Sequence, residues 1–375
     1  MNRLYQLAHL GQSIWFDNIN RSLLTGGGLR RMVDEGLLGV TSNPTIFDKA
    51  ISGSKDYDVQ IAALVRQSPG ITAPDVIRAL MVEDIRAAAD VLSPVYARTH
   101  GQDGYVSIEV TPTKARDEAA TVIEVRELWA SVHRPNVMIK IPATREGLPA
   151  VAQAISEGIN INVTLIFSEQ RYRQVADAYM TGLERRLQAD GSLEHVASVA
   201  SVFVSRIDTL VDALLEERLT QGAGAAGIAR LRGKAAVANT KTIYQAFKEL
   251  FGSPRFAALQ KQGAALQRPL WGSTGTKNPA YSDLLYVEPL IGPFTVNTVP
   301  PQTYDAILDH CSPRLSIESD LREAASMLQA LAEAGIHMDE VLDRLEAEGV
   351  ASFEKSFDGL HKSLEGKIHA LLNKK

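Results

Sequence analysis

The sequence contains one cysteine, Cys311, and no long hydrophobic run. A single cysteine excludes an intramolecular disulfide and favours a reducing compartment; no activating base stands beside it, which favours a structural role. No apolar stretch approaches the roughly 18 residues of a membrane span, and the N-terminus lacks a signal peptide's apolar core and cleavage site. The eight histidines are scattered without a zinc-ligand spacing. We therefore expect a cytoplasmic protein without a metal site or membrane contact.

The sequence also lacks a large excess of positive or negative charge: the net charge is −5, and charges of both signs are mixed along the 375 residues. Such a balance argues against nucleic acid as the main partner. Local cations and helix N-termini can still bind small phosphorylated molecules. The 45% hydrophobic and 22% charged residues are typical of a folded soluble protein.

Short apolar segments alternate with longer amphipathic ones, which predicts βα units and a parallel sheet. Helices are expected over 74–92 and 168–187. Eight strands favour a closed (β/α)₈ barrel, read as a single domain over 1–375 with a helical insertion at about 48–100 and C-terminal helices at about 317–375. GAGAAG (222–227) follows a helical segment and indicates a turn, not a dinucleotide site. The expected strands lie at 13–17, 37–41, 105–110, 137–141, 161–167, 200–204, 268–273 and 290–296.

Polar residues stand where most of these strands end, which in a barrel is the active-site face. The strongest candidate for a functional residue among them is Lys140, which lies inside the apolar strand VMIKI. Burial disfavours a charged amine, so this lysine is suited to attack a ketone and form a Schiff base. The spacing equally allows a lysine held by a structural carboxylate, or one whose amine reaches out of the strand end.

Two carboxylates, Asp17 and Glu109, are likewise embedded in apolar strands. Together with an amine they would serve imine chemistry as general acids and bases, although either could instead cap a strand end or pair with an arginine. Asn162 and Thr164 alternate with apolar residues, and this period of two places both side chains inside the barrel. The loop WGSTGTKNP (271–279) can offer backbone N–H groups and an ammonium to a phosphate, or be an ordinary polar loop.

The segments SIWFDNI, GVTSNPTIF, VSIEV, VMIKIPAT, INVTLIFS and SVFVSRID resemble the transaldolase family, most closely its longer bacterial type. The resemblance implies that Lys140 forms the Schiff base and that Asp17 deprotonates the C4 hydroxyl of the substrate. It implies that Glu109 and Thr164 hold the water that transfers protons. Substrate-binding roles are implied for Asn43, Asn162, Ser201, Phe203, Arg206, Ser273 and Lys277.

What the resemblance implies is a pentose phosphate pathway enzyme that transfers a dihydroxyacetone unit between sugar phosphates. No metal or organic cofactor is expected, because the iminium is itself the electron sink. Shorter family members carry an arginine soon after the loop serine, where this chain has STGTK and Lys277. Two alternatives are a fructose 6-phosphate aldolase, whose family is shorter and uses Gln and Tyr where this chain has Glu109 and Phe203, and a catalytically silent binding barrel. A homo-oligomer is left open.

Overall fold

The computed structural model describes residues 2–220 and 225–372. Within them, eight strands pair in parallel with their sequence neighbours, and β8 pairs with β1, which closes the sheet into a barrel. The (β/α)₈ barrel expected from the sequence is confirmed. The strands are β1 (Gln12–Phe16), β2 (Gly39–Val40), β3 (Tyr105–Glu109), β4 (Val137–Pro142), β5 (Ile161–Ile166), β6 (Ser198–Phe203), β7 (Arg268–Gly272) and β8 (Thr295–Val299).

The eighth strand lies later in the chain than the expected position near 290–296, because β8 begins only at Thr295 and the two ranges overlap at 295–296. Leu290 ends the short 3-10 helix η2 (Glu288–Leu290), and Phe294 is half exposed with a φ of 59°. Leu290 and Ile291 are buried as loop residues in the core outside the barrel, so their apolar character does not indicate a strand. The true strand carries the buried polar residues Asn297 and Thr298, which an apolar pattern does not select.

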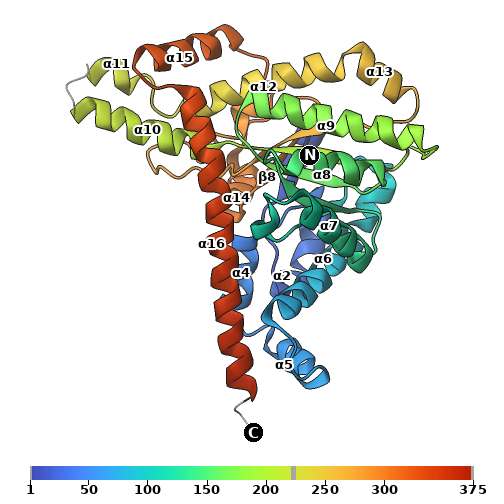
Figure 1. Cartoon of the computed structure of the whole chain (residues 1–375). Helices are drawn as coiled ribbons and strands as arrows, with labels where there is room; N and C mark the ends of the chain where they lie inside the picture. The colour runs from blue at the N-terminus through green and yellow to red at the C-terminus, as the bar shows by residue number, and fades with distance from the viewer. Residues whose placement is uncertain (1, 221–224, 373–375) are drawn as a thin grey trace.

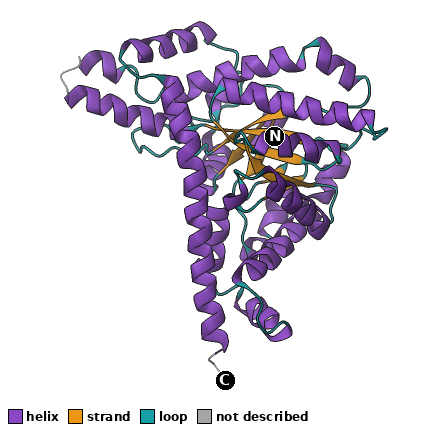
Figure 2. Ribbon diagram, viewed as in Figure 1, coloured by secondary structure: helices purple, strands orange, loops and turns teal. Residues whose placement is uncertain are grey.

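Helices enclose the strands on the outside of the barrel (Figure 2). Those expected over 74–92 and 168–187 correspond to α6 and α9, and the expected insertion holds α4, α5 and α6. No helix in the described residues is long and apolar enough to cross a membrane. The helices are α1 (Arg3–His9), α2 (Arg21–Thr25), α3 (Gly28–Asp34), α4 (Pro44–Gly53), α5 (Asp58–Gln67), α6 (Ala73–Arg98), η1 (Pro112–Lys114), α7 (Glu118–Val132), α8 (Gly147–Ser156), α9 (Glu169–Gln188), α10 (Ser205–Thr220), α11 (Ala225–Ala229), α12 (Ala235–Phe251), α13 (Pro254–Gln260), α14 (Pro301–His310), α15 (Leu321–Glu333) and α16 (Met338–Leu372).

Of the GAGAAG segment, residues 222–224 lie outside the described residues, and α11 begins at Ala225. The single-domain organisation stays a prediction.

The inside of the barrel is closed at the N-terminal ends of the strands. There Arg268 forms a buried ion pair with Asp103 at 2.8 Å, and Ser13 donates a hydrogen bond to the same carboxylate. An apolar layer follows, formed by Trp15, Tyr105, Met138, Ala197, Val199, Leu270 and Val296. Since this end is filled, a ligand can enter the barrel only from the C-terminal ends of the strands.

The long helix α16 packs against α4, α5, α6, α10 and the strand β5. In Figure 1 it is the long red helix that passes α10 and α4. Gly349 permits a close approach to β5, because a Cβ there would lie 3.0 Å from Leu165 Cδ2. The buried side chains of α16 recur at helical spacing, and this apolar stripe faces the barrel; they include Leu342, Leu345, Phe353, Leu360 and Leu364.

Candidate active site

Three of the predicted site residues lie side by side on adjacent strands. Glu109 pairs with Lys140 across β3 and β4, and Lys140 pairs with Asn162 across β4 and β5. Residues in register on neighbouring parallel strands point to the same face of the sheet, which here is the inside of the barrel. The structure therefore brings an amine, a carboxylate and an amide together at the C-terminal ends of the strands.

Lys140 is 4% exposed and does not reach out to solvent. Its Nζ lies 3.2 Å from Glu109 Oε2 and donates a hydrogen bond to the Ser42 carbonyl oxygen at 3.3 Å. The amine therefore does not reach out of the strand end, and its pairing with Glu109 fits both a nucleophile and a lysine held by a carboxylate. A buried amine with one carboxylate partner is poised for proton transfer between the two groups.

Among the described residues, Lys140 is the one cation paired with the Glu109 carboxylate. Apart from the contact with Lys140 Nζ, neither of its buried oxygens has a hydrogen-bond partner among the described residues. Burial raises the pKa of Glu109, Lys140 lowers it, and the charge of Asp17 raises it further. Thr164 Oγ1 is also buried without a partner in the described chain. Because buried polar groups are normally satisfied, these atoms are available to a group that enters the barrel.

Asp17 follows β1 directly, and its Oδ1 accepts a hydrogen bond from Thr41 Oγ1 at 2.7 Å. The same hydroxyl lies 2.5 Å from Thr298 Oγ1, so Thr41 is fixed from two sides. Desolvation raises the pKa of Asp17, whereas Lys140, the Thr41 hydrogen bond and Lys277 lower it. A raised pKa brings a carboxylate closer to the range of an effective general base at neutral pH.

The two asparagines are positioned in different ways. Asn162 Nδ2 donates to Ser107 Oγ at 3.0 Å, and its Oδ1 accepts from Ser201 Oγ at 2.6 Å. Asn43 is the N-cap of α4, and its side chain accepts from the Ile46 N–H at 3.0 Å. Asn43 thus has a structural role as a cap, in addition to any role in binding.

The loops after β6 and β7 meet beside this cluster. The Ser205 N–H donates to the Ser273 carbonyl oxygen at 3.0 Å, and the two hydroxyls are also 3.0 Å apart. Arg206 lies in the first turn of α10, with its Cζ 5.3 Å from the centre of the Phe203 ring. Lys277 is exposed, and its charge acts on Asp17. The predicted phosphate-loop residues therefore gather on the active-site face.

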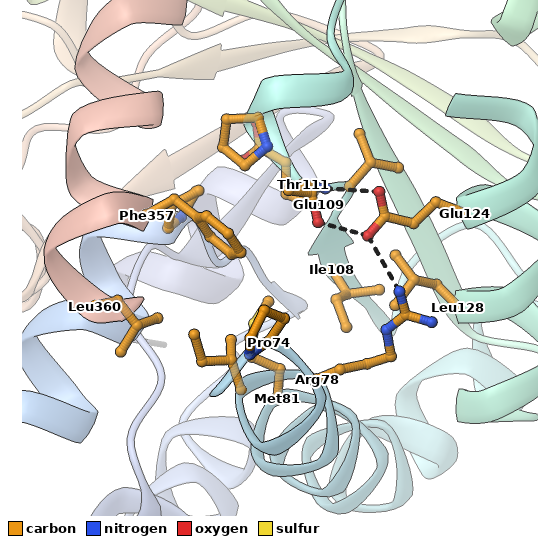
Figure 3. Close-up of a pocket in the computed structure, with 14 residues that line it drawn as sticks. Pro74, Arg78, Met81, Ile108, Glu109, Thr111, Glu124, Leu128, Phe357 and Leu360 are labelled. Atoms are coloured by element: carbon orange, nitrogen blue, oxygen red, sulfur yellow. Dashed lines mark hydrogen bonds and ion pairs between the residues drawn. The ribbon is translucent and has the colours of Figure 1, made fainter. Parts of the chain in front are cut away.

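A cavity of about 50 Å³ lies behind the end of β3 (Figure 3). On its wall, the buried Glu124 accepts hydrogen bonds from Thr111 N and Oγ1 at 3.1 and 2.6 Å. Glu124 also forms ion pairs with Lys114 at 3.3 Å and Arg78 at 3.8 Å. These bonds fix the backbone two residues after Glu109, which helps to hold its carboxylate in place.

Sequence reasoning missed several residues that the structure places in the site. Thr41 and Ser42 precede Asn43 in the quoted segment GVTSNPTIF, so motif position alone could have suggested them. Ser107 shares the inward face of β3 with Glu109, a signal given by the period of two. Phe353 lies on α16 beside Lys140, and no local pattern distinguishes it from other apolar residues of that helix. Cys311 is buried, and burial raises the pKa of its thiol to about 11, which agrees with a structural role.

The segment between β7 and β8 is tied to α10 by two tyrosines. Tyr286 donates its hydroxyl to Asp208 at 3.0 Å, and Tyr281 donates to Asp212 at 2.6 Å. Asp208 also accepts from the Ala236 N–H at 2.8 Å. Burial raises the pKa of Asp208 to about 6, against these hydrogen bonds, which lower it. The folded chain therefore binds this proton more tightly than the unfolded chain does.

We expect Asp208 to make stability fall as pH rises from about 4 to about 7. The carboxyl ionises at lower pH when unfolded, so folding is favoured below that range and less so above it. The shift corresponds to ~3 kcal/mol in the free energy of unfolding. Urea unfolding at several pH values should show this: between about pH 4 and pH 7, the free energy of unfolding of the wild type should fall by ~3 kcal/mol relative to that of Asp208→Asn. Parallel pH profiles of the two proteins would show that Asp208 ionises normally.

The closed barrel, with a lysine–carboxylate pair buried at the C-terminal ends of its strands, defines the class: a (β/α)₈ barrel of the class I aldolase type. A family model described as Transaldolase/Fructose-6-phosphate aldolase matches residues 14–364. The chain belongs to this family.

Proteins that are similar to this chain over nearly its full length carry the name of the same family. The chain is 45% identical to a protein named Transaldolase from Trichodesmium erythraeum, over 99% of this chain and 98% of the relative. It is 47% identical to Transaldolase 2 of Streptomyces coelicolor, over 98% of each chain, and 48% identical to a Transaldolase of Acidothermus cellulolyticus, over 95% and 94%. The family and the enzyme class expected from the sequence are confirmed.

Proposed function

We propose that this enzyme transfers a dihydroxyacetone unit from a ketose phosphate to an aldose phosphate through a Schiff base on Lys140. The donor is sedoheptulose 7-phosphate or fructose 6-phosphate, and the acceptor is glyceraldehyde 3-phosphate or erythrose 4-phosphate. The observation that carries the proposal is the buried pair of Lys140 Nζ and Glu109 Oε2, 3.2 Å apart at the open end of the barrel. Family membership supports the reaction class.

The first half-reaction forms the imine. Lys140 gives up a proton and attacks the C2 carbonyl of the donor, and the carbinolamine then loses water. Glu109 and Thr164 hold the water that carries these protons, since both have buried oxygens without partners in the described chain. Glu109 suits this shuttle because burial raises its pKa, so that both protonation states are accessible nearer neutral pH.

The second step breaks the C3–C4 bond. Asp17 takes the proton of the C4 hydroxyl, the C3–C4 electrons move into the iminium, and the aldose phosphate leaves. The remaining enamine on Lys140 attacks the carbonyl of the acceptor, and the steps then reverse. Asn43 and Asn162 bind substrate hydroxyls and the enamine, and Ser201 holds the Asn162 amide at 2.6 Å.

The substrate phosphate is bound by Arg206, Ser273 and Lys277, with Phe203 lining the pocket. Arg206 is the main cation, because its planar group can donate two hydrogen bonds at once. The exposed Lys277 contributes as a point charge. We also propose a cytoplasmic location, since the one cysteine cannot form an intramolecular disulfide and its thiol is buried, which fits a reducing compartment.

Borohydride reduction in the presence of fructose 6-phosphate should trap a covalent adduct on Lys140. Hydride reduces the imine to a stable secondary amine, which peptide mapping by mass spectrometry locates. Lys140→Met is the control and should give no adduct. Labelling of Lys277 or another lysine would contradict the assignment.

The same samples separate transfer from simple cleavage. A transferase should release little free dihydroxyacetone, and an added acceptor aldose phosphate should take up the three-carbon unit and appear as a new ketose phosphate. Steady release without acceptor would indicate an aldolase instead. The two outcomes leave the Lys140 assignment intact while deciding the reaction type.

A further inference from the structure

Phe353 places an aromatic ring from α16 between the lysine and the arginine of the site. Its side chain is 3% exposed. The ring centre is 5.7 Å from Lys140 Nζ, 5.9 Å from Arg206 Cζ and 6.4 Å from the Phe203 ring centre. Phe353 is more than 140 residues beyond either cation in the sequence, so it reaches them only because α16 packs across this end of the barrel.

The Arg206 guanidinium has no hydrogen bond or ion pair with the described residues; it lies against the rings of Phe203 and Phe353, with its Cζ 5.3 and 5.9 Å from the ring centres. Desolvation lowers the pKa of Arg206, and the charge of Glu348 partly opposes this. Aromatic faces attract a cation without using its N–H donors. The two rings can therefore hold the guanidinium in place while its five donors remain available to an anion.

We propose that Phe353 is a positioning residue for substrate phosphate: with Phe203, it holds the Arg206 guanidinium in the orientation that binds the phosphate group. This inference rests on the proposed function, in which Arg206 binds that group. It assigns α16 a part in substrate affinity as well as in the fold. A leucine at this position would keep most of the apolar packing but would lack the charge distribution of the ring that attracts a cation.

The test compares Phe353→Leu with Phe357→Leu, a matched control one turn further along α16. Phe357 is partly buried and lines the cavity behind β3, where no cation–aromatic contact is found among the described residues (Figure 3). Phe353→Leu should raise KM for fructose 6-phosphate roughly two- to thirty-fold, with kcat changed less than about twofold. The inhibition constant of inorganic phosphate should rise by the same factor, whereas KM for unphosphorylated fructose should not. Phe357→Leu should leave all three near wild type.

A double variant decides whether Phe353 acts through Arg206. Arg206→Ala should itself weaken phosphate inhibition, and Phe353→Leu should add nothing in that background. Multiplied effects in the double variant, or equal losses on fructose and fructose 6-phosphate, would overturn the proposal. Phe353→Met, a second apolar replacement, serves if the leucine variant unfolds at lower temperature.

Failure of this inference differs from failure of the proposed function. If Arg206→Ala weakens phosphate inhibition but Phe353→Leu does not, only the role of Phe353 is wrong. If Arg206→Ala leaves phosphate inhibition unchanged, the phosphate site itself is wrong and the inference falls with it. The borohydride adduct on Lys140 tests the chemistry independently of both variants.

Discussion

Asp17→Asn will lower kcat by about 10²–10⁴-fold while still allowing fructose 6-phosphate to form a reducible adduct on Lys140. Asparagine keeps the shape of the side chain and can accept the hydrogen bond from Thr41. It cannot take the C4 hydroxyl proton, so the C3–C4 bond does not break. The enzyme should therefore stop after imine formation, and the donor adduct should accumulate.

Rapid mixing followed by borohydride quench measures this directly. The yield of adduct on Lys140 should reach at least the wild-type level, whereas release of glyceraldehyde 3-phosphate should be slow. Activity of the wild type should also fall on acidification at a higher pH than is usual for an aspartate, because burial raises the pKa of Asp17 and its base form is lost sooner. A variant that traps no adduct would place Asp17 in an earlier step.

Glu109→Gln will slow imine formation by a similar factor, about 10²–10⁴-fold. The wild-type carboxylate lies 3.2 Å from Lys140 Nζ, and its buried oxygens have no other hydrogen-bond partner among the described residues. Glutamine is close in size but cannot exchange a proton with the amine or with a water between Glu109 and Thr164. In this variant both the imine on Lys140 and the released product should therefore form slowly.

The quench experiment separates this variant from the previous one, because adduct on Lys140 should appear slowly. Glu124→Gln is the matched control, since Glu124, on α7, is as buried as Glu109 but contacts Thr111 and Lys114 rather than Lys140. It should affect stability more than the rate of adduct formation. Fast adduct formation with slow cleavage in Glu109→Gln would assign Glu109 to the later step.

Much of the fold follows from local pattern. Seven of the eight strands lie close to the apolar runs that predict them, because strands buried on both faces require continuous apolar sequence. The eighth strand was misplaced because Leu290 and Ile291, which precede it, are buried in the outer core. The strand itself carries two buried polar residues: Asn297, which donates to the Tyr286 carbonyl oxygen outside the barrel, and Thr298, which contacts Thr41 inside it. A run of apolar residues reports burial, and burial alone does not distinguish a strand from a packed loop.

Lys140, Glu109 and Asn162 could be placed in buried strands from the sequence alone, because each interrupts or alternates with apolar residues in a short run. Only the tertiary structure decided that these three are in register on adjacent strands, that Asn162 is held by Ser107 and Ser201, and that Phe353 lies against both cations. The first kind of information is local, since alternation and hydropathy act over a few residues. The second depends on strand pairing and on the packing of α16 against the barrel, which join residues far apart in the chain and leave no local signal.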